Sequence, residues 1–211
     1  YYYINLVKKK KLENQFDKKR INYFVGDLES KKFIQLVGKK VKYVDNLVNN
    51  AGIANKDYFI NVKPKDLDKI IDINFKSYFF LSQIFAKKMV QNRIKGSIIS
   101  ISSQLGHVGA FNRTAYCSTK FALEGFTKSA AMDLGKHGIR VNTVAPTKII
   151  VNERERKNEK KRLNLIKKKI PLNRFSTTIE IASIVYFLTT DSAKSITGTS
   201  IISDGGWTCG K

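Results

Sequence analysis

Cysteine is nearly absent from this sequence, which has Cys117 and Cys209 as its two cysteines in 211 residues. They are far apart and belong to no C-x-x-C spacing, so we expect two reduced thiols and neither a disulfide framework nor a zinc site. Histidine is equally scarce, and His107 and His137 have no catalytic or metal-binding partner in the surrounding sequence. The sequence therefore predicts no metal site.

Long apolar runs are also missing. No run approaches the roughly 20 residues that a membrane-spanning helix requires, and no signal-peptide core is visible. We therefore expect a soluble protein of the cytoplasm with no membrane partner. The length of 211 residues fits one domain, over residues 1–211, that is large enough to bury a continuous core.

Acidic residues are few, because 17 Asp and Glu stand against 39 Lys and Arg, for a net charge of +22. Such an excess can indicate a nucleic acid, an anionic membrane or an acidic protein as partner. Here the cations are spread along the chain, and the clusters at Lys8 to Lys11, Arg154 to Arg162 and Lys167 to Lys169 are typical of solvated helix faces. We therefore expect no nucleic-acid partner, and nucleic-acid binding is the least favoured alternative.

Apolar runs of strand length alternate with longer segments of helical periodicity. This pattern predicts the α/β class, with a doubly wound parallel sheet of the Rossmann-like type. Strands are expected at residues 1–7, 21–25, 45–48, 97–102, 140–145 and 199–203, and helices at 8–19, 29–40, 65–91, 116–134, 152–169 and 178–189.

A glycine-rich turn is missing from the beginning of the sequence. In a dinucleotide-binding fold the first strand leads into such a turn, whose backbone amides hold the pyrophosphate. The first expected strand here is similar to the second strand of such a fold. We therefore interpret the sequence as an N-terminally truncated fold that lacks the first strand and its Gly-rich turn.

Two hydroxyls, those of Ser103 and Tyr116, could converge on one carbonyl oxygen, with Lys120 beside Tyr116. Tyr116 and Lys120 are four positions apart and so share one face of an expected helix. A nearby cation favours the phenolate form of a tyrosine and brings its proton exchange towards neutral pH. Ser103 ends an expected strand, at the edge of the sheet where ligands of such folds bind.

Asn74 interrupts an apolar helix, where a buried amide must find hydrogen-bond partners. Taken alone, it is better explained as a structural asparagine that kinks the helix. Together with the three residues above, it is a fourth candidate for the site.

The order and spacing of these residues resemble the short-chain dehydrogenase/reductase superfamily. The resemblance extends from about residue 21 onward and includes Asn49-Asn50-Ala51-Gly52, Asn74, Ser103, Tyr116-x-x-x-Lys120, Arg140-Val141-Asn142 and Asp204-Gly205-Gly206. It implies that Tyr116 is the general acid in carbonyl reduction and that Ser103 polarises the carbonyl. It also implies that Lys120 lowers the Tyr116 pKa and binds the nicotinamide ribose, and that Asn74 holds a water linked to Lys120.

The same resemblance implies a nicotinamide cofactor, NADP or NAD. The residues assigned to it are Asp27, Asn50, Ala51, Gly52, Tyr116, Lys120, Pro146, Thr147 and Ile149. The family's commonest pattern has Gly and a later Thr where this sequence has Thr147 and Val151. Lys8 and Lys9 would suit the 2′-phosphate of NADP, which favours that cofactor, although ordinary surface lysines are the alternative.

Loop residues resemble those of L-xylulose/carbonyl reductases and bacterial sugar-type dehydrogenases. By this analogy Ser103, Gln104, Ala110 and Arg113 contact the substrate, which is expected to be a small polyol, sugar or other carbonyl compound. One alternative is a 3-oxoacyl-(acyl carrier protein) reductase, and another is a catalytically silent chain that cannot bind cofactor. The family further implies a homotetramer built on the two long helices.

Overall fold

The structure is a computed structural model that describes residues 2–4, 22–150 and 160–210, with side chains for 22–150 and 163–210. Several expectations lie outside these residues. They are the helix at 8–19, the roles of Lys8 and Lys9, the position of Val151, and most of the basic cluster Arg154 to Arg162.

Every strand pairs in parallel with its neighbours. The strands are β1 (Tyr2–Ile4) and β2 (Asn22–Phe24), which form one pair, and β3 (Asn46–Asn49), β4 (Ser97–Ile101), β5 (Arg140–Pro146) and β6 (Ser200–Ser203), which form a sheet in that order. The register aligns Leu47 with Ile98 and Ile98 with Val141, so one row of apolar side chains crosses three strands.

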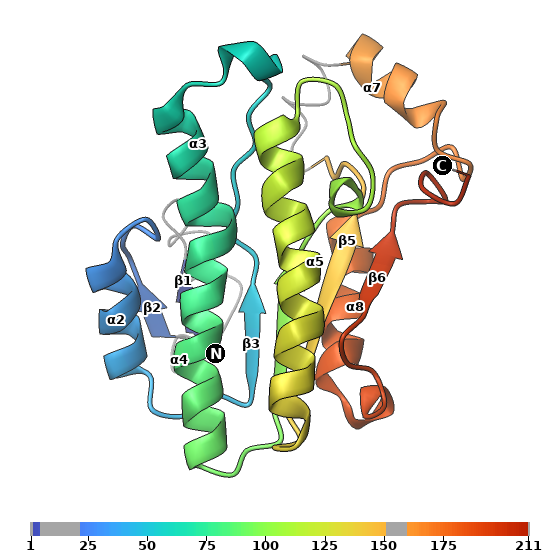
Figure 1. The fold of residues 1–211 in the computed structure, drawn as a ribbon. Helices are drawn as coiled ribbons and strands as arrows, with labels where there is room; N and C mark the ends of the chain where they lie inside the picture. The colour runs from blue at the N-terminus through green and yellow to red at the C-terminus, as the bar shows by residue number, and fades with distance from the viewer. Residues whose placement is uncertain (1, 5–21, 151–159, 211) are drawn as a thin grey trace.

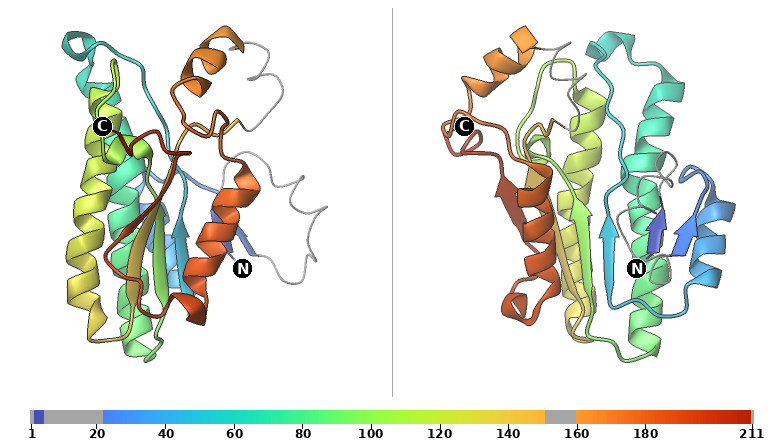
Figure 2. Two further views of the ribbon diagram at one scale, coloured as in Figure 1. Left: turned by 90° about the vertical axis from the view of Figure 1, so that its right-hand side faces the viewer. Right: turned by 180° about the vertical axis from the view of Figure 1, so that it is seen from behind.

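Helices connect the strands and cover both faces of the sheet (Figures 1 and 2). They are α2 (Lys31–Lys40), α3 (Pro64–Ile71), α4 (Ser77–Gln91), α5 (Thr114–Gly135), α7 (Lys160–Lys167) and α8 (Thr178–Thr189), with a π-helical turn η3 (Asp72–Lys76) and 3₁₀ turns η2 (Phe59–Asn61), η4 (Gln104–Gly106) and η5 (Asp191–Ala193). Figure 2 shows α8 on one face and α4 and α5 on the other. The predicted α/β class and Rossmann-like parallel sheet are confirmed.

Three clusters of buried apolar side chains form the core. One joins α4 and α5 to the sheet through Met89, Ala131 and Ile98. A second lies between α2 and α4, and a third lies between α8 and the other face of the sheet. The sheet therefore packs against α4 and α5 on one face and against α8 on the other, and α2 packs against α4.

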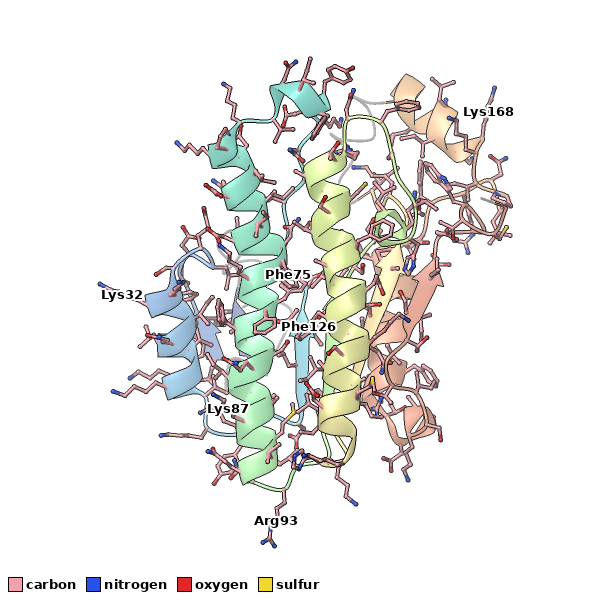
Figure 3. All side chains as sticks on the ribbon, in the orientation of Figure 1. Lys32, Phe75, Lys87, Arg93, Phe126 and Lys168 are labelled. Atoms are coloured by element: carbon pink, nitrogen blue, oxygen red, sulfur yellow. The ribbon has the colours of Figure 1, made fainter. Side chains whose placement is uncertain are left out.

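Charged side chains lie around the rim of the molecule. In Figure 3 the labelled Lys32, Arg93 and Lys168 project outward from different elements, whereas Phe75 and Phe126 lie between α4 and α5. Within the described residues, each helix is too short or too polar to cross a lipid bilayer.

The structure departs from the expected helix at 65–91 in the middle of that range. Pro64 begins the helix as expected, because a proline in the first turn costs no hydrogen bond. Residues 72–76 then form the π-helical turn η3, with Asn74 fully buried at its centre. Such turns often occur at functional sites, where the wider turn redirects a side chain.

Candidate active site

A cavity of about 220 Å³ opens at the carboxyl ends of β3, β4 and β5, the upper edge of the sheet in Figure 1. Its lining comprises Asn50, Gly52, Ile53, Ala54, Ile101, Ser102, Ser103, Tyr116, Lys120, Pro146 and Thr147. This is the edge at which parallel α/β sheets bind their ligands. The structure thus brings Ser103, Tyr116 and Lys120 together around one space.

Ser103 occupies the turn between β4 and η4. It caps η4, and its Oγ accepts a hydrogen bond from the Leu105 amide at 3.1 Å. Its hydroxyl also interacts with Tyr116, in the first turn of α5. Burial raises the pKa of the Tyr116 phenol, and the hydrogen bond with Ser103 and the charge of Arg113 act in the opposite direction.

Lys120 is buried, with 3% of its surface exposed. Its Nζ donates a hydrogen bond to the Ile101 carbonyl at 2.8 Å and lies 5.7 Å from the ring centroids of both Tyr116 and Tyr78. Burial lowers the pKa of Lys120 to about 8, while the Glu124 carboxylate acts to raise it. The ammonium is therefore the main form at pH 7, although it lies inside the protein.

The side chain of Asn74 joins three segments. Its Oδ1 accepts a hydrogen bond from the Ile53 amide at 2.9 Å, and its Nδ2 donates to the Ile53 carbonyl at 2.8 Å and to Thr119 Oγ1 at 3.3 Å. These bonds tie the π-helical turn to the loop after β3 and to α5. Ile53, which Asn74 holds through two hydrogen bonds, lines the cavity.

Tyr78 also shapes the site, although the sequence analysis did not identify it. Its hydroxyl donates a hydrogen bond to the Ala51 carbonyl at 2.6 Å, and burial raises its pKa, so the phenol stays neutral. The available signal was its position one helical turn after Asn74. A Cβ added at Gly52 would lie 3.4 Å from Asn74 Oδ1, so this loop passes close to the helix.

Several of the residues assigned to a cofactor line the cavity: Asn50, Gly52, Tyr116, Lys120, Pro146 and Thr147. Ala51 and Ile149 are not among the lining residues: the Ala51 carbonyl accepts a hydrogen bond from Tyr78, and Ile149 packs against the third core cluster. Asp27 is exposed in the turn before α2, where its carboxylate accepts a hydrogen bond from the Glu29 amide.

Two hydroxyls at the cavity have no hydrogen-bond partner among the residues that the structure describes. They are Ser102 Oγ and Thr147 Oγ1, and both residues are buried. A buried polar group without a partner costs stability unless a ligand or water satisfies it. These two hydroxyls are therefore available to hydrogen-bond a polar ligand or water at the cavity.

The residues expected to contact the substrate do not all line the cavity, whereas Ser103, Tyr116 and Lys120 do. Of the four, Ser103 lines the cavity. Gln104 is buried behind it, Ala110 is exposed in the loop before α5, and Arg113 donates a hydrogen bond to the Asn55 carbonyl. Arg113 thereby joins the loop after β3 to the start of α5.

Comparisons with known proteins identify relatives of this chain. A family profile described as Enoyl-(Acyl carrier protein) reductase matches residues 7–208. The chain is 41% identical to 3-oxoacyl-(acyl-carrier-protein) reductase FabG of Rickettsia conorii over 182 residues, which are 86% of this chain and 75% of that protein. It is 36% identical to carbonyl reductase (NADPH) 2 of Sus scrofa over 165 residues, 78% of this chain and 68% of that protein.

A solved structure, 4-hydroxyisoleucine dehydrogenase complexed with NADH, has a similar fold. Its TM-score is 0.90 at 31% sequence identity, and the match covers 100% of this chain and 88% of that one.

Proposed function

This chain belongs to the short-chain dehydrogenase/reductase family of NAD(P)-dependent oxidoreductases, and we propose that it interconverts a carbonyl and a secondary alcohol on a small polyol, sugar or related compound. The observation that carries the proposal is the cavity in which Ser103, Tyr116 and Lys120 meet at the carboxyl edge of the sheet.

In this proposal the protein's own groups act on the carbonyl oxygen. A bound nicotinamide supplies or accepts the hydride. The Tyr116 hydroxyl donates the proton to the oxygen during reduction, and the Ser103 hydroxyl donates a hydrogen bond that polarises the carbonyl. Lys120, held as an ammonium by its contacts, favours the phenolate left on Tyr116. Preorganised donors of this kind each contribute roughly 2.7–4 kcal/mol to barrier lowering.

For the cofactor we propose NADP, with NAD as the alternative. Asn50, Ala51 and Gly52 would border the ribose, and Pro146, Thr147 and Ile149 would border the nicotinamide amide, with Asp27 near the adenine. The Thr147 hydroxyl, which has no partner among the described residues, supports this assignment, because a carboxamide can both donate to it and accept from it. Carbonyl reductase (NADPH) 2 and the NADH complex of 4-hydroxyisoleucine dehydrogenase support the cofactor class but differ in the cofactor they name.

Thr147→Val tests the carboxamide site. The change keeps the shape and removes a hydroxyl that has no protein partner among the described residues, so we expect an intact fold and a Kd for NADPH that rises roughly 3–10-fold, the equivalent of one hydrogen bond. Fluorescence titration measures the Kd. Thr189→Val, at the end of α8, is the control and should bind as the wild type does. Equal affinity for Thr147→Val would remove Thr147 from the site.

The second candidate function is 3-oxoacyl-(acyl carrier protein) reduction. It is favoured by the 41% identity to the Rickettsia conorii protein and by the net charge of +22, which suits an acidic carrier. NADPH oxidation with a panel of ketoses and diacetyl, beside acetoacetyl thioesters, separates the two. Turnover of the ketoses or diacetyl alone supports the first function, and turnover of the thioester alone supports the second.

We further propose that the enzyme works in the cytoplasm as a homo-oligomer, a tetramer by analogy with its family. Both cysteines are free, in keeping with a reducing compartment. A largely apolar hollow of about 410 Å³ lies between α4 and α5, bordered by Phe79, Phe126 and Leu134, and supports a contact between copies. Sedimentation analysis tests the oligomeric state.

A further inference from the structure

A polar cluster lies between η4, α5, β5 and β6, with Glu124 and Thr143 buried and His107 and Ser200 half-buried. It consists of Glu124, Thr143, Ser200 and His107, and we call it the Glu124 cluster. Thr143 Oγ1 donates a hydrogen bond to Glu124 Oε2 at 2.9 Å, and Ser200 Oγ donates to Glu124 Oε1 at 3.4 Å. His107 Nε2 lies 3.0 Å from Ser200 Oγ and 3.4 Å from Glu124 Oε1.

The cluster combines a serine, a histidine and a carboxylate, but its geometry does not suit a nucleophile. In a hydrolytic triad the two nitrogens of the histidine face different partners. Here the same atom, His107 Nε2, faces both Ser200 and Glu124. None of the four residues lines the cavity. If these four residues affect a reaction in the cavity, they do so indirectly, through the residues that they contact.

One of those residues is Lys120, one helical turn before Glu124 on α5. The titratable groups that face Lys120 are the phenols of Tyr116 and Tyr78 and the carboxylate of Glu124. Of these, the carboxylate favours the ammonium, whereas burial disfavours it. Glu124, in turn, faces His107 from the η4 side and the hydroxyls of β5 and β6.

The cluster also reaches Ser103. Ser103 begins η4, and His107 ends it by donating its backbone N–H to the Gln104 carbonyl at 3.0 Å. Between them, a Cβ added at Gly106 would lie 3.1 Å from the Lys120 carbonyl oxygen, so η4 lies directly on α5. The His107 contact with Glu124 therefore fastens the segment that carries Ser103 to the helix that carries Tyr116 and Lys120.

We propose that Glu124 is a positioning residue of the reaction, whose buried carboxylate lies one helical turn from Lys120 and, through His107, holds the Ser103 turn against α5. The inference rests on the proposed function, because it assigns Glu124 to the same site. Glu124 touches neither the carbonyl nor the cofactor in this proposal and acts through Lys120 and His107.

Glu124→Gln tests the electrostatic part. The amide keeps the size of the side chain and removes its charge, so the titration midpoint of Lys120 should fall by roughly one pH unit. It is measured in the cofactor-free protein by NMR of ¹³C-labelled lysine, with the signal assigned by its loss in Lys120→Arg. The alkaline limb of kcat against pH should move down by the same amount, because Lys120 loses its proton at lower pH.

Two further variants serve as controls of charge. Asp133 is an exposed carboxylate on the same helix. Asp133→Asn should leave unchanged both the titration midpoint of Lys120 and the midpoint of the alkaline limb of kcat. Glu124→Asp keeps the charge and should restore most of the Lys120 midpoint. An unchanged Lys120 midpoint in Glu124→Gln would overturn the proposal.

His107 variants test the mechanical part. His107→Leu removes the contact and should lower kcat roughly tenfold with the Lys120 midpoint unchanged, while His107→Gln, which keeps a side-chain N–H, should recover most of the loss. If Glu124→Gln does not fold, this pair carries the test, and a kcat equal to wild type in His107→Leu would refute the link. A wild type with no turnover on any substrate would contradict the proposed function, but the Lys120 titration would still decide the role of Glu124.

Discussion

Tyr116→Phe is expected to lower kcat roughly 10²–10⁴-fold, the usual contribution of a positioned general acid. The change removes one oxygen and keeps the ring, which is half-buried at the start of α5. The proton that the carbonyl oxygen must receive during reduction then has no donor at that place. Steady-state NADPH oxidation on the best substrate of the panel measures the loss.

The control for this change is Tyr186→Phe, which removes the hydroxyl of an exposed tyrosine on α8 and should have no effect. Thermal unfolding of Tyr116→Phe should match the wild type, so the loss can be assigned to the site and not to the fold. Activity within a few-fold of wild type would mean that another group donates the proton, and the role proposed for Tyr116 would then be wrong.

Lys120→Met is expected to abolish most activity and yet stabilise the protein at neutral pH. Burial lowers the Lys120 pKa from 10.5 to about 8, so the folded state holds this ammonium at a cost of roughly 3 kcal/mol. Methionine fills the same space without charge. Loss of the hydrogen bond to the Ile101 carbonyl offsets about 1 kcal/mol of the gain.

The cost of burying the Lys120 ammonium, and with it the free energy of unfolding, depends on pH. Below pH 8 Lys120 is protonated in both the folded and the unfolded chain, and the cost of burying the charge is fully present. Between pH 8 and 10.5 the folded state loses the proton while the unfolded state keeps it, so the wild type gains stability as pH rises. The advantage of Lys120→Met, roughly 2 kcal/mol at pH 7, should therefore vanish by about pH 10.5.

Urea unfolding of both proteins at pH 7 and pH 10 measures this difference, and Lys128→Met, on the same helix, is the control. A Lys120→Met protein that is less stable than the wild type at pH 7 would show that the ammonium makes stabilising contacts that outweigh its burial. Such a result would place the working pKa of Lys120 well above 8.

Much of the fold followed from the pattern of apolar residues. Strand-length runs buried on both sides of a parallel sheet differ from helices with one apolar face, so the α/β class and most element positions could be predicted. The helix at 178–189 has the predicted bounds, and the strand at 140–145 extends one residue further to Pro146. The π-helical turn at 72–76 was not predicted, because its extra residue per turn serves contacts of Asn74 with segments distant in sequence.

The sequence by itself determined the family and the class of fold, and it predicted Ser103, Tyr116 and Lys120 for the site, because their spacing is a local property of one strand and one helix. Only the tertiary structure decided how deeply each is buried and what surrounds it. The lowered pKa of Lys120, the burial of the Thr147 hydroxyl and the carboxylate of Glu124 beside His107 all depend on side chains from separate strands and helices meeting. Desolvation and charge pairing are set by three-dimensional neighbours, and no local spacing in the chain encodes them.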